Sequence, residues 1–247
     1  MATGEFLLID NSNSFTKLSL ASREKLLGRP RRVATRELSE ASFSKALRGW
    51  RFETAVLSSV VPQKGEWIAS YFADRPLLRV SSSLRLGVGI DYPKPKTIGA
   101  DRLANAASAA ALFGAPVVVV DFGTAVSFDI IARSGDYVGG VIAPGLEAMT
   151  DYLHQRTALL PKISLLEPPR AIGKSTKQAM LAGAVHGYRG LIRQILSEIK
   201  AELGERRLPV VATGGYAELI AARLPEIGSV LPNLTLEGLR IIGSLNV

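Results

Sequence analysis

The sequence predicts an α/β fold built from two similar units in succession. An apolar run that ends in Asp10 is followed by a polar turn and a second apolar run, and the same order returns after the apolar run that ends in Asp121. In both places a further strand and a helix follow, which is typical of a duplicated α/β architecture. The length of 247 residues corresponds to between one and two domains. We therefore expect two duplicated domains, residues 1–115 and 116–247, with a cleft between them.

The first half is expected to alternate short strands with helices. Its boundaries carry recognisable signals, since Ser39 is a typical helix N-cap, Pro62 closes an apolar run, and Gly114 with Pro116 ends a helical stretch. Glycines and prolines in residues 81–98 predict a loop. The expected strands are 5–9, 15–21, 31–35, 54–61 and 77–80, and the expected helices are 39–50, 65–73 and 100–113.

The second half begins with a fully apolar strand that leads into Asp121 and the turn Phe122-Gly123-Thr124. A later apolar run leads into Thr213-Gly214-Gly215, where small residues would allow a flat base to approach the backbone; alone this is a weak signal. The expected strands are 117–120, 126–132, 137–143 and 210–212, and the expected helices are 146–159, 176–203, 217–224 and 236–245.

Composition excludes several classes of protein. Hydrophobic residues make up 47% and charged residues 21% of the chain, which fits a folded domain and not a disordered one. There is no cysteine, so disulfides, thiolate nucleophiles and cysteine zinc sites are excluded. His154 and His186 are the only histidines, which leaves little material for a metal cluster or a Ser-His-Asp triad. We assign His154 no role.

The distribution of charge argues against nucleic acid as a partner, although a basic surface would also attract anionic substrates. The net charge is +8, but the basic residues are spread in short clusters with no run of five or more. We therefore expect a solvated basic surface and no nucleic-acid partner. The chain begins without a signal-peptide pattern and contains no apolar stretch long enough to span a membrane, so we expect a cytoplasmic protein without membrane contact.

The pair of strand-to-strand turns is the strongest chemical signal. The first contains Asp10, Asn11, Ser12, Asn13, Ser14 and Lys17, and the second contains Asp121, Gly123 and Thr124. Small residues let backbone amides approach a phosphate, and an aspartate at a strand end can hold a cation. Taken singly, each turn is also compatible with an ordinary polar hairpin.

A second signal is Gly99-Ala100-Asp101-Arg102 at the expected start of a helix. An aspartate there is either a helix-capping residue or a general base, and the neighbouring arginine would grip an anionic or polar substrate. Gly173-Lys174-Ser175 has the tail of a P-loop, but position 168 is proline where that motif needs glycine. No dinucleotide-binding glycine pattern follows the first strand either.

Read in series, these motifs resemble one family. They are Asp10-x-x-Asn13-x-x-x-Lys17, Gly99-Ala100-Asp101-Arg102, Asp121-Phe122-Gly123-Thr124-Ala125, Gly139-Gly140-x-Ile142-x-Pro144-Gly145 and Thr213-Gly214-Gly215. Their order and spacing are similar to those of the type III pantothenate kinases, from Asp10 to the segment Asn233–Leu239. The resemblance implies two duplicated actin-like, or ribonuclease H-like, domains with ATP in the cleft, and a homodimer.

The resemblance also implies an activity and a set of site residues. The family transfers the γ-phosphoryl group of ATP to the terminal hydroxyl of pantothenate, the first step of coenzyme A biosynthesis, with Mg²⁺ and a monovalent cation, K⁺ or ammonium. Asp101 is then the catalytic base, and Thr124 contacts ATP while Asp121 binds the monovalent cation. Tyr92, Gly99, Ala100, Asp101, Arg102 and Thr176 bind pantothenate, and Asp10, Asn11, Ser12, Asn13, Ser14, Phe15, Thr16 and Lys17 form the ATP phosphate loop.

Three positions depart from the family pattern: Ser12, Ser14 and Val126 stand where glycine, threonine and threonine are usual. A Cβ at Ser12 is costly if the backbone there has positive φ or packs against a phosphate, so we expect a high KM for ATP that Ser12→Gly lowers. Two alternatives stay open: a catalytically weak kinase-fold regulator or accessory protein, and a kinase of the same fold for another sugar or acid.

Overall fold

The computed structural model describes residues 2–247, which form two compact units. Unit 1 contains the residues up to Ala115 together with Arg133–Val138 and Asn233–Val247, and unit 2 contains Pro116–Ala132 and Gly139–Pro232. This division differs from a single cut between residues 115 and 116, because the C-terminal helix packs on elements of the first half.

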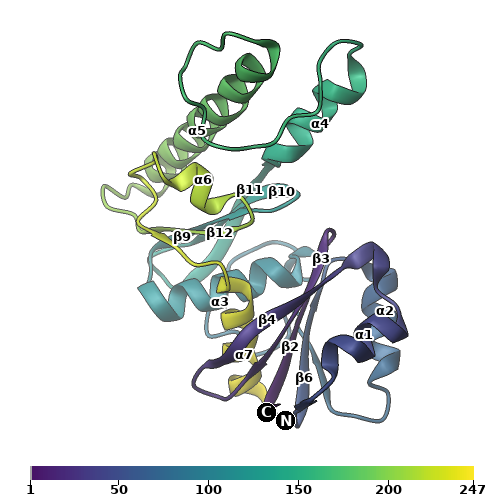
Figure 1. The fold of residues 1–247 in the computed structure, drawn as a ribbon. Helices are drawn as coiled ribbons and strands as arrows, with labels where there is room; N and C mark the ends of the chain where they lie inside the picture. The colour runs from purple at the N-terminus through teal and green to yellow at the C-terminus, as the bar shows by residue number, and fades with distance from the viewer. Residues whose placement is uncertain (1) are drawn as a thin grey trace. The chain divides into compact units, whose positions relative to one another are not determined.

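Unit 1 is organised around a five-stranded sheet with the order β4-β3-β2-β6-β7. Strand β2 is antiparallel to β3 and parallel to β6, so β2 lies at the centre of the sheet. Helices α1 and α2 cover one face through a core that contains Leu7, Ile9, Phe43, Ile68 and Phe72 (Figure 1). The bounds are β2 Phe6–Asn11, β3 Phe15–Ala21, β4 Leu26–Ala34, β6 Thr54–Ser59, β7 Leu77–Arg79, α1 Glu40–Leu47 and α2 Pro62–Tyr71.

Helices α3 (Ala100–Phe113) and α7 (Leu234–Asn246) pack together on the other face of this sheet (Figure 1). They approach closely because a Cβ on Gly238 would lie 1.9 Å from the Ala104 carbonyl oxygen, a space that only glycine leaves open. Thr235 donates a buried hydrogen bond of 2.8 Å to Asn105 between the two helices. The start of α3 is thereby fixed against the sheet.

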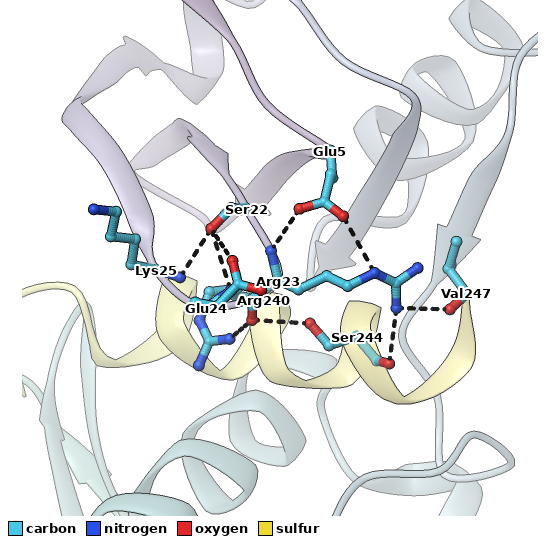
Figure 2. Close-up of polar contacts among 8 residues, drawn as sticks. All are labelled: Glu5, Ser22, Arg23, Glu24, Lys25, Arg240, Ser244 and Val247. Carbon is cyan, nitrogen blue, oxygen red and sulfur yellow. Dashed lines mark hydrogen bonds and ion pairs between the residues drawn. The ribbon is translucent and has the colours of Figure 1, made fainter.

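The C-terminal end of α7 is attached to the β3–β4 turn by Arg23 (Figure 2). The Arg23 guanidinium donates to Glu5 at 3.2 Å and to the backbone carbonyls of Val247 at 3.0 Å and Ser244 at 3.4 Å. Arg240 on α7 donates in return to the Arg23 carbonyl oxygen. A cation at a helix C-terminus satisfies carbonyls that have no partner within the helix, so Arg23 adds to the packing that joins α7 to unit 1.

Unit 2 contains the strands β13-β12-β9-β10 and, from Gly139 onward, β11, in that order. Strand β9 is antiparallel to β10 and parallel to β12, so the centre of this sheet repeats the plan of unit 1. The side chain of Tyr188 on α5 packs against Phe122 of β9. The bounds are β9 Val117–Phe122, β10 Ala125–Ile131, β11 Asp136–Pro144, β12 Val210–Gly214, β13 Ser229–Val230, α4 Leu146–Arg156, α5 Thr176–Leu203 and α6 Ala217–Ala221.

Most predicted elements are present, and each of the main differences has a physical cause. Pro62 begins α2 at its first turn, where its missing N–H is not needed, so the expected start at residue 65 is three residues late. The expected loop 81–98 contains the short strand β8 (Gly89–Ile90) and a 3₁₀ turn. The two-residue strands β1 (Ala2–Thr3) and β5 (Trp50–Arg51) pair with each other, and such short strands carry no periodicity in sequence.

Across residues 2–247, none of the helices combines the length and the apolar character that crossing a bilayer requires.

Candidate functional site

The turn after β2 is closed by three hydrogen bonds of Ser12, one of which joins it to Asp10. Ser12 donates its hydroxyl to Asp10 Oδ1 at 2.8 Å and its backbone N–H to the Phe15 carbonyl at 3.2 Å. Thr35 donates its hydroxyl to the Ser12 carbonyl at 2.7 Å. Asp10 is only 3% exposed, so its carboxylate is held in one place at the carboxyl end of the central strand.

Asn11 and Thr16 lie beneath this turn and are fully buried. Asn11 donates to Thr16 Oγ1 at 2.8 Å and accepts the Ser59 hydroxyl at 2.8 Å, and the Thr16 and Thr35 hydroxyls are 3.2 Å apart. A buried polar network in which the groups satisfy one another fixes the backbone of the turn above it. These two predicted ATP-binding residues therefore support the turn with their side chains.

The other residues of the predicted phosphate loop are accessible. Asn13, Ser14 and Phe15 are exposed at the tip of the hairpin, and Lys17 is half-buried on β3. Lys17 is the cross-strand partner of Asp10, so both side chains lie on the same face of the sheet.

The backbone at Ser12 is not strained. Among residues 2–247, positive φ is found only at glycines, so Ser12 does not occupy the left-handed region. The expected conformational cost of positive φ at Ser12 is therefore wrong. Its hydroxyl instead has a function in the structure, because it orients Asp10.

The predicted substrate residues of unit 1 gather around the start of α3. The Asp101 carboxylate accepts the Arg102 backbone N–H at 2.8 Å and folds back over Gly99, where an added Cβ would lie 2.6 Å from Asp101 Oδ1. Gly99 has φ −59°, so glycine is needed here for space and not for backbone freedom. The local sequence Gly99-Ala100-Asp101 thus sets the position of the carboxylate.

Tyr137 joins two predicted substrate residues, and the sequence reasoning did not select it. The Arg102 guanidinium carbon lies 5.7 Å from the centroid of the Tyr137 ring, and the Tyr92 ring meets Tyr137 edge-on at 6.2 Å. Tyr137 is completely buried, and its backbone pairs with Ile90 of β8. An aromatic residue at the start of a predicted strand is ordinary in sequence, so only the fold indicates this role.

An open cavity of ≈ 460 Å³ adjoins the start of α3. Gly99 and Ala100 form part of its wall, and Lys96 and a run of serine hydroxyls supply polar groups for a small anionic molecule. Its lining consists of Ser59, Val60, Val80, Ser81, Ser82, Ser83, Lys96, Ile98, Gly99 and Ala100.

The remaining predicted residues lie in unit 2. Asp121 is half-buried near the end of β9, and Thr124 is exposed in the following turn. Gly145 donates its N–H to the Thr124 carbonyl at 3.1 Å, and a Cβ there would lie 2.6 Å from the Gly123 carbonyl oxygen. Thr176 is the first residue of α5, whose N-cap is Ser175. The ATP cleft itself stays a prediction.

Tyr216 lies just after the end of β12, next to Gly214 and Gly215. Burial raises the pKa of Tyr216, and the nearby carboxylates of Glu147 and Asp151 raise it further. The phenol is therefore neutral at physiological pH and forms a hydrogen bond with the Glu147 carboxylate.

The carboxylates of the site are too few to hold a metal ion alone, but they fit a cation that is also bound by oxygen atoms of the substrate. Over residues 2–247 there is no cluster of three or more histidine or carboxylate side chains that would hold a metal alone. Mg²⁺ in phosphoryl-transfer sites is commonly held by one or two carboxylates together with substrate phosphates. Asp10 meets that need, because the Ser12 hydroxyl fixes it at a strand end.

Comparison with known proteins places this geometry in a family. The family model described as type III pantothenate kinase matches residues 6–198. The chain belongs to the type III pantothenate kinase family. A type III pantothenate kinase of Akkermansia muciniphila is 54% identical over 98% of this chain and 99% of the relative. One of Methylacidiphilum infernorum is 42% identical over 97% of this chain and 88% of the relative.

Solved structures confirm the predicted fold class, two actin-like domains. The activator of 2-hydroxyisocaproyl-CoA dehydratase from Clostridium difficile, with bound ADPNP, has a TM-score of 0.55 at 11% identity and covers 97% of this chain and 94% of that chain. The ethanolamine utilization protein EutJ from Carboxydothermus hydrogenoformans has a TM-score of 0.56 at 17% identity and covers 96% of this chain and 89% of that chain. At such low identity the likeness concerns the fold alone.

Proposed function

We propose that this pantothenate kinase uses Asp101 as the base that accepts the proton of the pantothenate hydroxyl. Membership of the family gives the activity: the chain phosphorylates pantothenate with ATP in coenzyme A biosynthesis. The observation that carries the residue assignment is the Asp101 carboxylate, fixed at the start of α3 by the Arg102 N–H and by the space over Gly99. A general base needs a defined position relative to the proton that it takes.

The neighbouring residues then position the substrate. Arg102, with its guanidinium beside Tyr137, has donors suited to the carbonyl and hydroxyl oxygens of pantothenate. Gly99 and Ala100 let the substrate approach the backbone, and Tyr92 and Thr176 supply further contacts. Phosphoryl transfer depends mainly on such positioning and on charge stabilisation. A carboxylate base, an arginine and a backbone surface that fits the substrate supply the positioning.

The ATP phosphates are assigned to the turn Ser12–Ser14 and to Lys17, with Thr124 as a further contact. Asp10, oriented by Ser12, would hold Mg²⁺, which neutralises phosphate charge when bound. The Asp121 carboxylate would hold a monovalent cation, K⁺ or ammonium. The assignment of the first turn draws support from the buried network beneath it, which fixes its backbone.

A homodimer is part of the proposal. Unit 2 exposes an apolar surface on α4 and on the segment that follows it, and a second copy of the chain would cover this surface. Its members are Met149, Tyr152, Leu153, Leu159 and Leu166, of which Leu159 is 88% exposed. Sedimentation of the wild-type chain and of Tyr152→Glu tests this: we expect a dimer that the substitution weakens, and a monomeric wild type would contradict it.

The decisive experiment on function is Asp101→Asn. We expect kcat to fall by a factor of about 10² to 10⁴, because the amide cannot take the proton, while ATP affinity measured by calorimetry stays unchanged. Asp91→Asn, which changes a carboxylate in the segment before Tyr92, is the matched control and should retain turnover. Near-normal kcat in Asp101→Asn would refute the assigned base.

The cation assignment is tested by pantothenate-dependent ADP release in K⁺, ammonium and Na⁺ salts. Release that needs K⁺ or ammonium, and that loses this preference in Asp121→Asn, is the expected result. Equal rates in all three salts would refute the monovalent cation site.

A further inference from the structure

Two adjacent arginines of β4 occupy opposite faces of the unit 1 sheet. The Arg31 guanidinium lies 3.9 Å from the centroid of the Trp50 ring and donates to the carbonyls of Ala46 at 2.6 Å and Arg48 at 2.9 Å. These contacts join β4 to the end of α1, so Arg31 has a structural role.

Arg32 is held in a similar way but has no polar partner. Its guanidinium lies 3.8 Å from the centroid of the Phe15 ring, at the tip of the predicted phosphate loop. Within residues 2–247 it forms no hydrogen bond or ion pair, and its side chain is exposed. An arginine stacked on an aromatic ring keeps its donors in a fixed plane, available to an outside acceptor.

Arg32 continues a row of functional side chains across the sheet. It is the cross-strand partner of Lys17, Lys17 is the partner of Asp10, and Asp10 is the partner of Ser58 on β6. Directly paired residues of neighbouring strands present their side chains on one face. The row Arg32, Lys17, Asp10 and Ser58 therefore lies on the face opposite to that of α1.

This row contains an unbalanced charge and an unused donor. Lys17, like Arg32, has no ion-pair partner within residues 2–247, so two cations stand on adjacent strands. Like charges at directly paired positions destabilise a sheet, and a multivalent anion reverses that effect. At the other end of the row, the Ser58 hydroxyl is 1% exposed and has no hydrogen-bond partner.

We propose that Arg32 is a second cation that binds the polyphosphate group of ATP, with the Phe15 ring as its support. The inference rests on the proposed assignment of the turn Ser12–Ser14 to the ATP phosphates. The planar guanidinium binds two phosphate oxygens at once, whereas the Lys17 ammonium acts as a point charge. A polyphosphate is the ligand that uses both, since it carries several charges along its length.

The test is calorimetric titration of the full-length protein with ATP and with inorganic tripolyphosphate. Arg32→Gln should weaken both ligands by about tenfold, the effect of losing a charge-assisted contact at an exposed site. Phe15→Leu, which leaves the charge but removes the ring, should weaken them by about threefold. Arg31→Gln is the matched control, and Arg29→Gln replaces it if loss of the Arg31 contacts impairs folding.

The outcomes separate this inference from the function on which it rests. If Lys17→Gln weakens ATP binding and Arg32→Gln does not, the role of Arg32 is refuted and the phosphate loop stands. If neither variant weakens binding, the assignment of the loop fails, and the inference fails with it. If the control arginine variant weakens binding as much as Arg32→Gln, only net charge matters, and the positional role is refuted.

Discussion

The β2–β3 hairpin of unit 1 and the β9–β10 hairpin of unit 2 share one plan and differ in what supports the turn. In each, a six-residue strand runs antiparallel to a seven-residue strand, and the aspartate, Asp10 or Asp121, is the fifth residue of the first strand. The second strands have the same sequence of exposed and buried positions. The connecting turns are Ser12–Ser14 in unit 1 and Gly123–Thr124 in unit 2.

The residues that support the two turns are polar in unit 1 and apolar in unit 2. In unit 1 the last residue of the first strand is Asn11, paired with Ser59 and bonded to it. In unit 2 the corresponding residues are Phe122, which packs against Tyr188, and its partner Gly214. The third residue of the second strand is also different, Lys17 in unit 1 and Ser127 in unit 2. One backbone plan thus carries a hairpin that pairs its aspartate with a lysine and rests on polar bonds, and a hairpin that pairs its aspartate with a serine and rests on apolar packing.

The largest effect on stability is expected from Gly214→Ala, which disrupts the packing of β12 against β9 in unit 2. Gly214 has φ +94°, and a Cβ there would lie 2.6 Å from backbone atoms of Phe122. We expect a loss of about 3 kcal/mol in the free energy of unfolding, measured by urea denaturation. Gly215→Ala is the control, because a Cβ at Gly215 meets nothing within 4 Å. Equal stability of the two variants would contradict the packing argument.

Lys17→Gln tests the charge difference between the hairpins. Loss of an ammonium–phosphate contact should lower kcat/KM for ATP by a factor of about ten to one hundred. Ser127→Ala, at the corresponding position of unit 2 and paired with Asp121, removes no charge and adds no bulk beside that carboxylate, so it should change kcat/KM less than about twofold. Comparable losses of kcat/KM in both variants would contradict the proposal that the unit 1 hairpin, and not the unit 2 hairpin, supplies the cation for the ATP phosphates.

Two ion pairs, one from each unit, differ in burial, which predicts a pH dependence. Arg189 of unit 2 is 5% exposed and binds Glu167 at 2.7 Å, whereas Arg79 and Glu66 of unit 1 form an exposed pair. The hydrogen bond from Arg189 is the main cause that lowers the pKa of Glu167 from its ordinary value of 4.5. The pair therefore stabilises the fold above that value, and the stabilisation is lost as pH falls through the lowered pKa.

We expect Glu167→Gln to cost about 1 kcal/mol at neutral pH, allowing for screening of the partly exposed carboxylate, and to cost progressively less below the ordinary glutamate pKa. Unfolding curves over a pH series measure this difference. Glu66→Gln is the control and should have a smaller effect at every pH. A cost for Glu167→Gln that does not change with pH would contradict the ion-pair explanation.

The smallest effect concerns Ser12. Ser12→Ala removes the hydroxyl that orients Asp10, and we expect the KM for ATP to rise about twofold, the effect of one modest hydrogen bond. Ser12→Gly removes the same hydroxyl and relieves no positive φ, so we expect it to raise the KM by a similar factor and not to lower it. Steady-state kinetics on both variants decide the point: a lower KM in Ser12→Gly would restore the expectation drawn from the sequence.

Local signals account for the elements and motifs that the sequence predicted correctly. The helix 176–203 is confirmed at both ends because Ser175 caps its start and Gly204 its end, and both signals act within one turn. The start of α2 was missed because Pro62 fits both a strand end and the first turn of a helix. The short pairing of β1 with β5 joins segments far apart in the chain, and no local pattern announces it.

The sequence by itself determined the duplicated order of strands, the two aspartates at the strand ends, and Asp101 with Arg102 at a helix start, because periodicity and capping act over a few residues. Only the tertiary structure decided that Tyr137 lies between Tyr92 and Arg102, and that Arg32 stands beside Lys17. It also decided that α7 completes unit 1. These are pairings between distant segments, which register and packing select and which no single segment encodes.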